Sequence, residues 1–421
     1  MFFRILRNSK VCLSLILFIG FITRFVYFLK TPFPLSSDKL LEHYPDENVY
    51  YMFAELINNK GLWTAFLDER SLWVAPLNSM YISILSGVTS QPILFIRLVN
   101  IFISVLFIFI IYKISKKLFN TKVGLLAALF VSVYFPIIEV SPTLLTEPLF
   151  MLLLSLFALF ILKERETHST KYLVLSALFL ALATLTRSVT LLAPGFIALA
   201  FIQKGISKKI ILQRMTIFIV SFGLVISPVI LKNFIVFNKF TISNGSGAAL
   251  YLGTRPDTEG DEPPYRGKDY ATMEITTPFN HLQSEGDERL RQVAISNIKN
   301  NFFDYCYWNV KKVGRLLVGN EYYWFFPFNN ALSYYHEFGL LQTVIKIFNM
   351  LLALIVSVFG GYYLFVCCIR KQYNNPVILL IMYIVIFSLP FLVIPRYGLP
   401  VVCLLSIFAA GYFFSENKVK L

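Results

Sequence analysis

Apolar residues fall into long runs separated by short polar stretches. A helix needs about 20 residues to cross a bilayer, because its backbone polar groups must be satisfied within the segment. The pattern therefore predicts an all-α polytopic membrane protein with about ten transmembrane helices. The runs that we interpret as spans lie near 11–29, 94–112, 123–140, 147–162, 172–187, 189–202, 211–231, 343–368, 376–394 and 398–415.

Two segments between these runs are too long for plain connections, namely 30–93 and 232–342. Loops beyond about 15 residues usually carry function or are disordered. Both segments contain aromatic residues and helical patterns, so we expect two structured outer loops. The chain then divides into an N-terminal membrane module at 1–231, an outer region at 232–342 and C-terminal membrane helices at 343–421.

Shorter patterns subdivide the outer loops. The apolar stretch 76–89 is too short to cross, and we expect it in or near the membrane interface. In the second loop, 285–318 predicts two amphipathic helices. Ahead of them, 243–269 is rich in Gly, Pro and Asp and predicts an ordered irregular loop.

Basic residues orient the predicted spans, since short cytoplasmic loops are rich in Lys and Arg. Eighteen Lys and Arg but only three acids lie on one side of the spans, and the rest of the chain is balanced. This distribution predicts that both termini are cytoplasmic. We expect the protein in a bacterial plasma (inner) membrane. The segments concerned are 1–10, 113–122, 163–171, 203–214, 370–375 and 416–421.

Composition agrees with a membrane class. The chain of 421 residues is 57% hydrophobic and 15% charged, whereas soluble domains carry about 25% charged residues. The net charge of +14 resembles that of a nucleic-acid-binding protein. Because the excess lies in the predicted cytoplasmic loops, we interpret it as topological and expect membrane lipids, not nucleic acid, as partners.

Acidic residues cluster at the outer ends of the predicted helices. Asp46 and Glu47 follow Pro45, and Glu147 follows Thr146 at the head of the fourth run. Acids in a first helical turn are also favoured by the helix dipole alone. Near a membrane surface, however, carboxylates also suit proton abstraction from a hydroxyl or binding of a divalent cation.

Arginines occupy the same predicted depth: Arg97, Arg187 and Arg396. A lone arginine at the end of a span most often reaches toward lipid headgroups. Arg187 interrupts an otherwise apolar run, and Arg396 lies in a short connection with a proline on either side. Guanidinium groups in such places suit bidentate binding of a lipid-linked phosphate. The sequence contains no glycine-rich nucleotide-binding motif.

These residues together resemble the polyprenyl-phosphate-sugar-dependent glycosyltransferases of family 39, in the GT-C superfamily. That family includes protein O-mannosyltransferases and the lipid A aminoarabinose transferase. The matching residues are, in chain order, Asp46, Glu47, Tyr50 and Ala54, then 146–149 (TEPL), 182–187 (LATLTR), 233–237 (NFIVF), Gly247, Leu250, Tyr251, Gly253 and 396–400 (RYGLP).

The resemblance implies a GT-C fold and a sugar donor carried on a polyprenyl phosphate. Transfer would occur at the outer face, to a lipid, glycan or protein acceptor. It implies Asp46 as the acid nearest the reacting hydroxyl, Glu47 beside it and Glu147 as a further acid of the site. Some relatives need a divalent metal, which leaves the cofactor unknown and a metal held by Asp46 and Glu47 open.

One departure from the family concerns the donor phosphate. Many relatives carry a Lys-Pro-Pro stretch in the first outer loop, but the matching residues 75–77 are Ala-Pro-Leu. We therefore expect Arg187 and Arg396 to bind the phosphate, with Arg70 as a further contact.

Three other functions fit parts of the pattern. A transporter or flippase for a lipid-linked sugar would also use aromatic-rich spans, but transporters often show repeated halves and charges at mid-membrane depth. An O-antigen ligase or polymerase would act on similar substrates. A membrane scaffold would not require the acids and arginines to converge.

Overall fold

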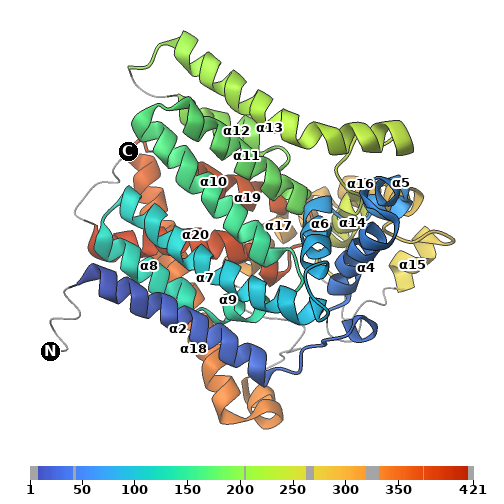
Figure 1. Ribbon diagram of the computed structural model, residues 1–421, viewed down its shortest axis with the longest axis horizontal. Coiled ribbons are helices and arrows are strands. Elements are labelled where there is room, and N and C mark those ends of the chain that lie inside the picture. Colours follow the sequence, from blue (N-terminus) through green and yellow to red (C-terminus); the bar gives the residue numbers. More distant parts are fainter. Residues whose placement is uncertain are drawn as a thin grey trace.

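The computed structural model describes residues 8–40, 44–202, 205–261, 270–318, 331–372 and 374–415. Every regular element in these ranges is a helix (Figure 1), which confirms the predicted all-α class. The basic ends at 1–7 and 416–421, and residues 262–269 of the predicted irregular loop, lie outside this description.

The predicted membrane region contains eleven labelled α-helices within the described ranges. They are α2 (Ser9–Lys30), α7 (Pro92–Leu118), α8 (Thr121–Val133), α9 (Phe135–Val140), α10 (Glu147–Thr167), α11 (Thr170–Thr186), α12 (Ala193–Ile197), α13 (Lys208–Phe237), α18 (Ala331–Ile369), α19 (Pro376–Ser388) and α20 (Leu399–Phe414). The first outer loop contributes α4 (Pro45–Lys60), α5 (Leu62–Leu67) and α6 (Pro76–Ser86), and the second contributes α14 (Ser246–Thr254), α15 (Tyr270–Thr276), α16 (Ser284–Asn300) and α17 (Phe302–Val318).

Among the described residues, five helical stretches are long and apolar enough to cross a membrane. They are α2, α7, α13, Phe338–Ile369 within α18, and Pro395–Phe414, which ends in α20. Three further apolar helices, α8, α11 and α19, are shorter. The structure thus supports an integral membrane protein, while the number of ten spans stays a prediction.

Three segments differ from the sequence prediction. Residues 189–202 form short turns of helix, not one span, because Pro194 removes a backbone donor. The run 123–140 breaks at Tyr134, where Pro136 begins a separate helix, α9. Part of the predicted irregular loop at 243–269 is the helix α14, which packs Ala248 and Tyr251 against α16.

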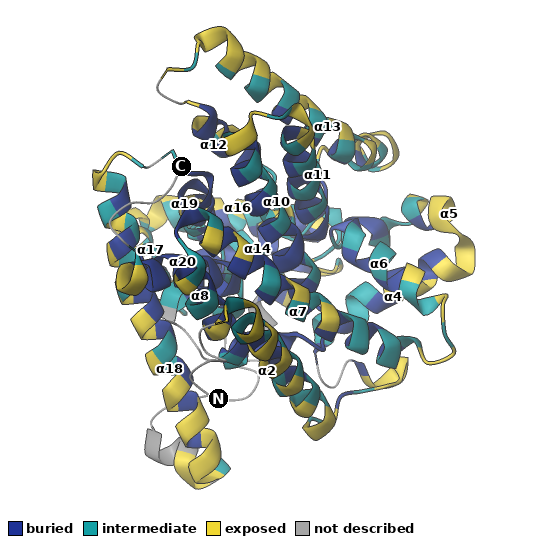
Figure 2. Cartoon of the chain, turned by 60° about the vertical axis from the view of Figure 1, so that its left-hand side comes forward, coloured by how far each residue is buried: buried dark blue, intermediate teal, exposed yellow. Residues whose placement is uncertain are grey.

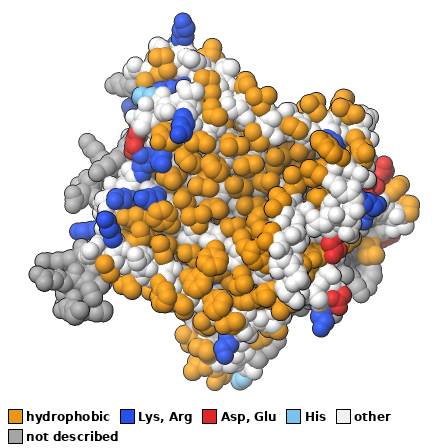
Figure 3. Space-filling view, in the orientation of Figure 1, with side chains coloured by type: hydrophobic (Ala, Val, Ile, Leu, Met, Phe, Trp, Pro, Cys, Tyr) orange, Lys and Arg blue, Asp and Glu red, His pale blue; other side chains and the backbone are white. Residues whose placement is uncertain are grey.

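The helices α7, α8, α10, α11 and α20 form the centre of the bundle, where most residues are buried (Figure 2). In contrast, α2, α13 and α18 expose apolar side chains along much of their length. In the view of Figure 3, hydrophobic side chains form a broad band across the middle of the molecule. This band is what a lipid-facing surface requires.

The short basic loops meet at one end of the bundle. Lys117 forms an ion pair with Glu166, and Arg165 donates to the Asn374 carbonyl. Asn120 donates to the carbonyl of Phe414 at 2.9 Å. These contacts join 113–122, 163–171, 370–375 and the end of α20, as the charge pattern predicts. That this end faces the cytoplasm stays a prediction.

Candidate active site at the outer helix ends

Four charged side chains from distant parts of the sequence meet at the opposite end of the bundle. Arg396 Nη2 pairs with Asp46 Oδ2, and Arg396 Nε lies 3.7 Å from Glu147 Oε1. Arg187 Nη1 donates to the same Glu147 oxygen at 2.7 Å. Asp46, Arg396, Glu147 and Arg187 therefore alternate in charge, and we call them the four-residue cluster.

Each member stands at a helix terminus. Asp46 and Glu147 lie in the first turns of α4 and α10, each beside a proline. Arg187 caps the C-terminus of α11, and Arg396 lies in the short helix η5 (Pro395–Gly398). The helix dipole favours carboxylates at helix N-termini, and it favours a cation such as Arg187 at a helix C-terminus. The local sequence thus stabilises the charges that the fold brings together.

The cluster opens to solvent at one member. The side chain of Asp46 is 44% exposed, whereas that of Glu147 is 3% exposed. The Arg187 guanidinium lies 4.7 Å from the ring centre of Tyr397, a cation–π arrangement. Tyr50, one turn after Asp46, faces all four charges, and burial raises the pKa of its hydroxyl. The Tyr50 hydroxyl therefore stays neutral.

Glu47 occupies a different environment from Asp46. Both of its oxygens accept hydrogen bonds from Arg97 at 3.0 Å, and both side chains are fully buried. The Leu144 backbone N–H donates to Glu47 Oε1 at 2.7 Å. The structure therefore places Glu47 in a separate buried pair and not in the four-residue cluster.

This arrangement does not fit a metal held jointly by Asp46 and Glu47. Both Glu47 oxygens already accept hydrogen bonds, and Asp46 pairs with Arg396. Within the described ranges, no group of three His, Cys, Asp or Glu residues is arranged to hold a metal ion. We therefore derive no chemical step through a metal.

The remaining predicted cation lies apart from the cluster. Arg70 pairs with Asp68, two residues away, at 2.6 Å, and its side chain is 36% exposed. The residue after it, Ser71, accepts a hydrogen bond at 2.9 Å from Lys232, which lies in the last turns of α13. Within the described part of the chain, Arg70 makes no ion pair with the four-residue cluster.

His281 was missed by the sequence analysis. It lies before α16, its side chain is exposed, and the carboxylates of Asp287 and Asp46 are the acidic groups that act on it. Among the charges that act on His281 is that of Asp46, a member of the four-residue cluster. No motif or spacing in the sequence connects His281 with Asp46, because only the packing of the second outer loop brings them together.

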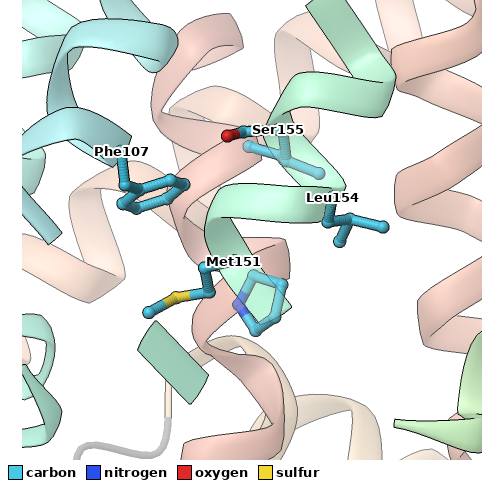
Figure 4. Close-up of a pocket in the computed structure, with 6 residues that line it drawn as sticks. Phe107, Met151, Leu154 and Ser155 are labelled. Atoms are coloured by element: carbon cyan, nitrogen blue, oxygen red, sulfur yellow. The ribbon is translucent and has the colours of Figure 1, made fainter. Parts of the chain in front are cut away.

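A small cavity within the bundle is not a substrate site. It lies between α7, α10 and α20 and is lined by Phe107, Met151, Leu154, Ser155, Pro400 and Leu404 (Figure 4). Its volume of about 10 Å³ has room for at most one water molecule. Its lining is apolar apart from Ser155, so it offers no chemistry for a sugar.

Comparison with solved structures shows a shared fold. The oligosaccharyltransferase AglB from Archaeoglobus fulgidus, in complex with an inhibitory peptide and a dolichol-phosphate, superimposes with a TM-score of 0.54 at 13% identity. The match covers 96% of this chain and 50% of that one. The same enzyme tethered to an acceptor peptide gives 0.54 at 14% identity, covering 96% and 49%. This chain thus spans about half the length of these proteins.

Sequence comparison adds a family. No curated protein sequence matches the chain. Residues 74–231, which include Glu147 and Arg187, match the family described as dolichyl-phosphate-mannose-protein mannosyltransferase. The resemblance inferred from the sequence is thereby confirmed over residues 74–231, and the solved structures share the fold over nearly the whole chain.

Proposed function

We propose that the protein transfers a sugar from a polyprenyl-phosphate donor to an acceptor hydroxyl at the outer membrane face, with Asp46 as the base. The observation that carries this proposal is the four-residue cluster, in which a solvent-open carboxylate pairs with one arginine and a buried carboxylate joins that arginine to a second. The matched family's description and the dolichol-phosphate in an AglB structure support a lipid-linked donor.

The proposed reaction uses both charges of the cluster. Asp46 accepts the proton of the acceptor hydroxyl while the oxygen of that hydroxyl forms a bond to the anomeric carbon of the sugar. The bond from that carbon to the phosphate oxygen breaks, and the polyprenyl phosphate leaves with the electron pair. Arg396 and Arg187 stabilise the charge that develops on the departing phosphate.

Glu147 has a supporting part in this proposal. It is nearly inaccessible to solvent and contacts both arginines, so it holds their guanidinium groups in place before the donor arrives. Such preorganisation lowers the cost of stabilising charge in the transition state. Glu147 therefore acts on the donor through Arg187 and Arg396 and not as a base.

Donor binding and base activation are coupled through Arg396. In the structure Arg396 pairs with Asp46. A donor phosphate bound to Arg396 competes for this guanidinium and releases the Asp46 carboxylate to face the acceptor. Binding of the donor thus prepares the base.

Two predicted residues take more distant roles. Glu47 fixes the start of α4 through Arg97, without contacting a substrate. Arg70 and Lys232 form a basic area near Ser71 at the outer end of α13. We assign Arg70 to an outlying contact with the lipid phosphate. The acceptor is a hydroxyl of a lipid, a glycan or a protein.

The donor class can be tested with the full-length protein in lipid nanodiscs. Radiolabelled polyprenyl-phosphate sugars are supplied in one series and nucleotide sugars in a matched control. We expect release of polyprenyl phosphate and labelled product only in the first series. Transfer from nucleotide sugars alone, or movement of the intact lipid-linked sugar across the bilayer without cleavage, would contradict the proposal.

A further inference from the structure

A buried lysine outside the cluster joins three segments of the chain. Lys312, on α17, is fully buried. Its ammonium donates to the backbone carbonyls of Gly253 at 2.7 Å, Leu389 at 3.0 Å and Phe391 at 3.1 Å. It also donates to Asn309 Oδ1 at 3.2 Å. Among the described residues no carboxylate lies within ion-pair distance of it, so backbone carbonyls are its main partners.

Two of these carbonyls belong to helix C-termini. Gly253 lies in the last turn of α14, and Leu389 caps α19. The final carbonyls of a helix have no partner within the helix, and the helix dipole places partial negative charge there. One ammonium thus serves two helix ends. The third carbonyl, Phe391, belongs to the irregular segment that leads to Arg396.

The same segment is held by direct backbone packing. A Cβ on Gly253 would lie 2.3 Å from the carbonyl carbon of Phe391, and one on Gly398 would lie 1.8 Å from the Leu316 oxygen. The Leu392 N–H donates to the Ala249 carbonyl at 2.8 Å. Residues 389–398 therefore lie between α14 and α17, and only glycine permits these close approaches.

We propose that Lys312 is a positioning residue that fixes the connection 389–398 and, through it, the guanidinium of Arg396 in the four-residue cluster. The inference rests on the proposed function in that Arg396 binds the donor phosphate. Loss of the lysine loosens this connection and weakens donor binding, while the base Asp46 and the acceptor side stay intact.

The surroundings of Lys312 make its charge sensitive to pH. The charged groups that face it are Arg315 on its own helix and Asp261 after α14, and the Tyr305 ring lies 5.6 Å away. Burial is the largest influence and lowers the pKa of Lys312 from 10.5 to about 8. Above that pH, the neutral amine has two N–H groups for these three carbonyls and the Asn309 side chain, so at least one of the carbonyls loses its hydrogen bond.

The adjacent lysine provides a matched control. Lys311 lies on the same helix but is exposed and pairs with Glu259. For Lys312→Met we expect the KM for the polyprenyl-phosphate donor to rise on the order of tenfold to a hundredfold, since small displacements of positioning groups are that costly. The acceptor KM should stay near that of wild type, and Lys311→Met should resemble wild type throughout.

A second readout separates positioning from the proposed function. Hydrogen exchange of the amides in 389–398 should accelerate in Lys312→Met but not in Lys311→Met, whether or not the donor is known. Failure of the wild type to use any lipid-linked donor would remove the proposed function, whereas this exchange would still test Lys312. Unchanged exchange and donor KM in Lys312→Met would overturn the inference.

The wild type supplies a test that needs no substitution. Its donor KM should rise between pH 7 and pH 9 as Lys312 loses its proton, and Lys311→Met should follow the same curve. If Lys312→Met does not insert, Lys312→Gln retains an N–H donor and should show an intermediate donor KM. A rise in donor KM between pH 7 and pH 9 that persists unchanged in Lys312→Met would come from other groups, such as Lys232, and would count against Lys312 as a positioning residue.

Discussion

Asp46 and Glu47 are adjacent acids in the first turn of one helix, yet they occupy opposite environments. Asp46 is 44% exposed and belongs to the four-residue cluster. Glu47 is fully buried and accepts hydrogen bonds from Arg97 and the Leu144 N–H. Residue type and helix position are nearly the same for both. The tertiary partner therefore decides which carboxylate is structural and which is available for chemistry.

The buried pair stabilises the frame around the cluster. Besides Glu47, Arg97 donates to the carbonyls of Pro34 and Pro142. It thus joins the first outer loop, α7 and the segment that leads into Glu147. Burying a pair of charges gains stability only when both are well hydrogen-bonded, as they are here. The comparison predicts that substitutions in the Glu47–Arg97 pair impair folding, whereas substitution of Asp46 impairs catalysis.

The largest expected effect is on folding. Arg97→Ala leaves Glu47 buried without its partner, which typically costs about 3–5 kcal/mol. We expect a lower yield of folded protein and a lower thermal midpoint, measured by fluorescence-detected gel filtration. The exposed pair Arg70–Asp68 is the control, and Arg70→Ala should change stability by at most about 1 kcal/mol. Equal thermal midpoints for Arg97→Ala and Arg70→Ala would contradict the claim that the buried pair stabilises the fold more than the exposed pair.

A smaller effect is expected from arginine substitutions in the cluster. Arg396→Lys and Arg187→Lys retain the charge but lose the planar pair of donors. We expect donor affinity to fall about tenfold, which corresponds to about 1.4 kcal/mol. Inhibition by free polyprenyl phosphate measures this affinity. If both Arg→Ala variants bind the lipid like wild type, neither arginine contacts the phosphate.

The smallest effect concerns pH and stability. Because the pKa of Lys312 is lowered to about 8 on folding, the unfolded chain binds more protons between pH 8 and pH 10.5. Stability from this group therefore rises with pH across that window. The thermal midpoint of wild type minus that of Lys312→Met should therefore increase by roughly a few degrees between pH 7.5 and pH 9.5. A constant difference would show that Lys312 does not titrate there.

The sequence predicted the all-α class of the fold better than it predicted where individual helices are interrupted. Long apolar runs identify α2, α7 and α13, since hydrophobic length is a direct requirement of the bilayer. The same criterion wrongly predicted a single span at 189–202, because hydropathy does not depend on the backbone N–H that Pro194 lacks. It also missed α14, whose stability comes from packing against α16.

The candidate site was partly visible in the sequence. Asp46, Glu147, Arg187 and Arg396 were named from their place at outer helix ends, and the structure brings them together. Glu47 and Arg70 share those local features but have other partners. The burial of Lys312 could not be predicted, since a lysine next to Lys311 in an amphipathic helix is expected on the solvent-exposed face. Burial of that kind depends on contacts between distant segments.

The most direct test of the account compares Asp46→Asn with Glu47→Gln in purified protein with a polyprenyl-phosphate sugar. Asp46→Asn should fold like wild type but transfer sugar at least about a hundredfold more slowly, since a general base contributes 10²–10⁴-fold. Glu47→Gln should lose folded protein while its folded fraction keeps most of its turnover. Near-normal turnover of Asp46→Asn would remove Asp46 from the mechanism and contradict the account.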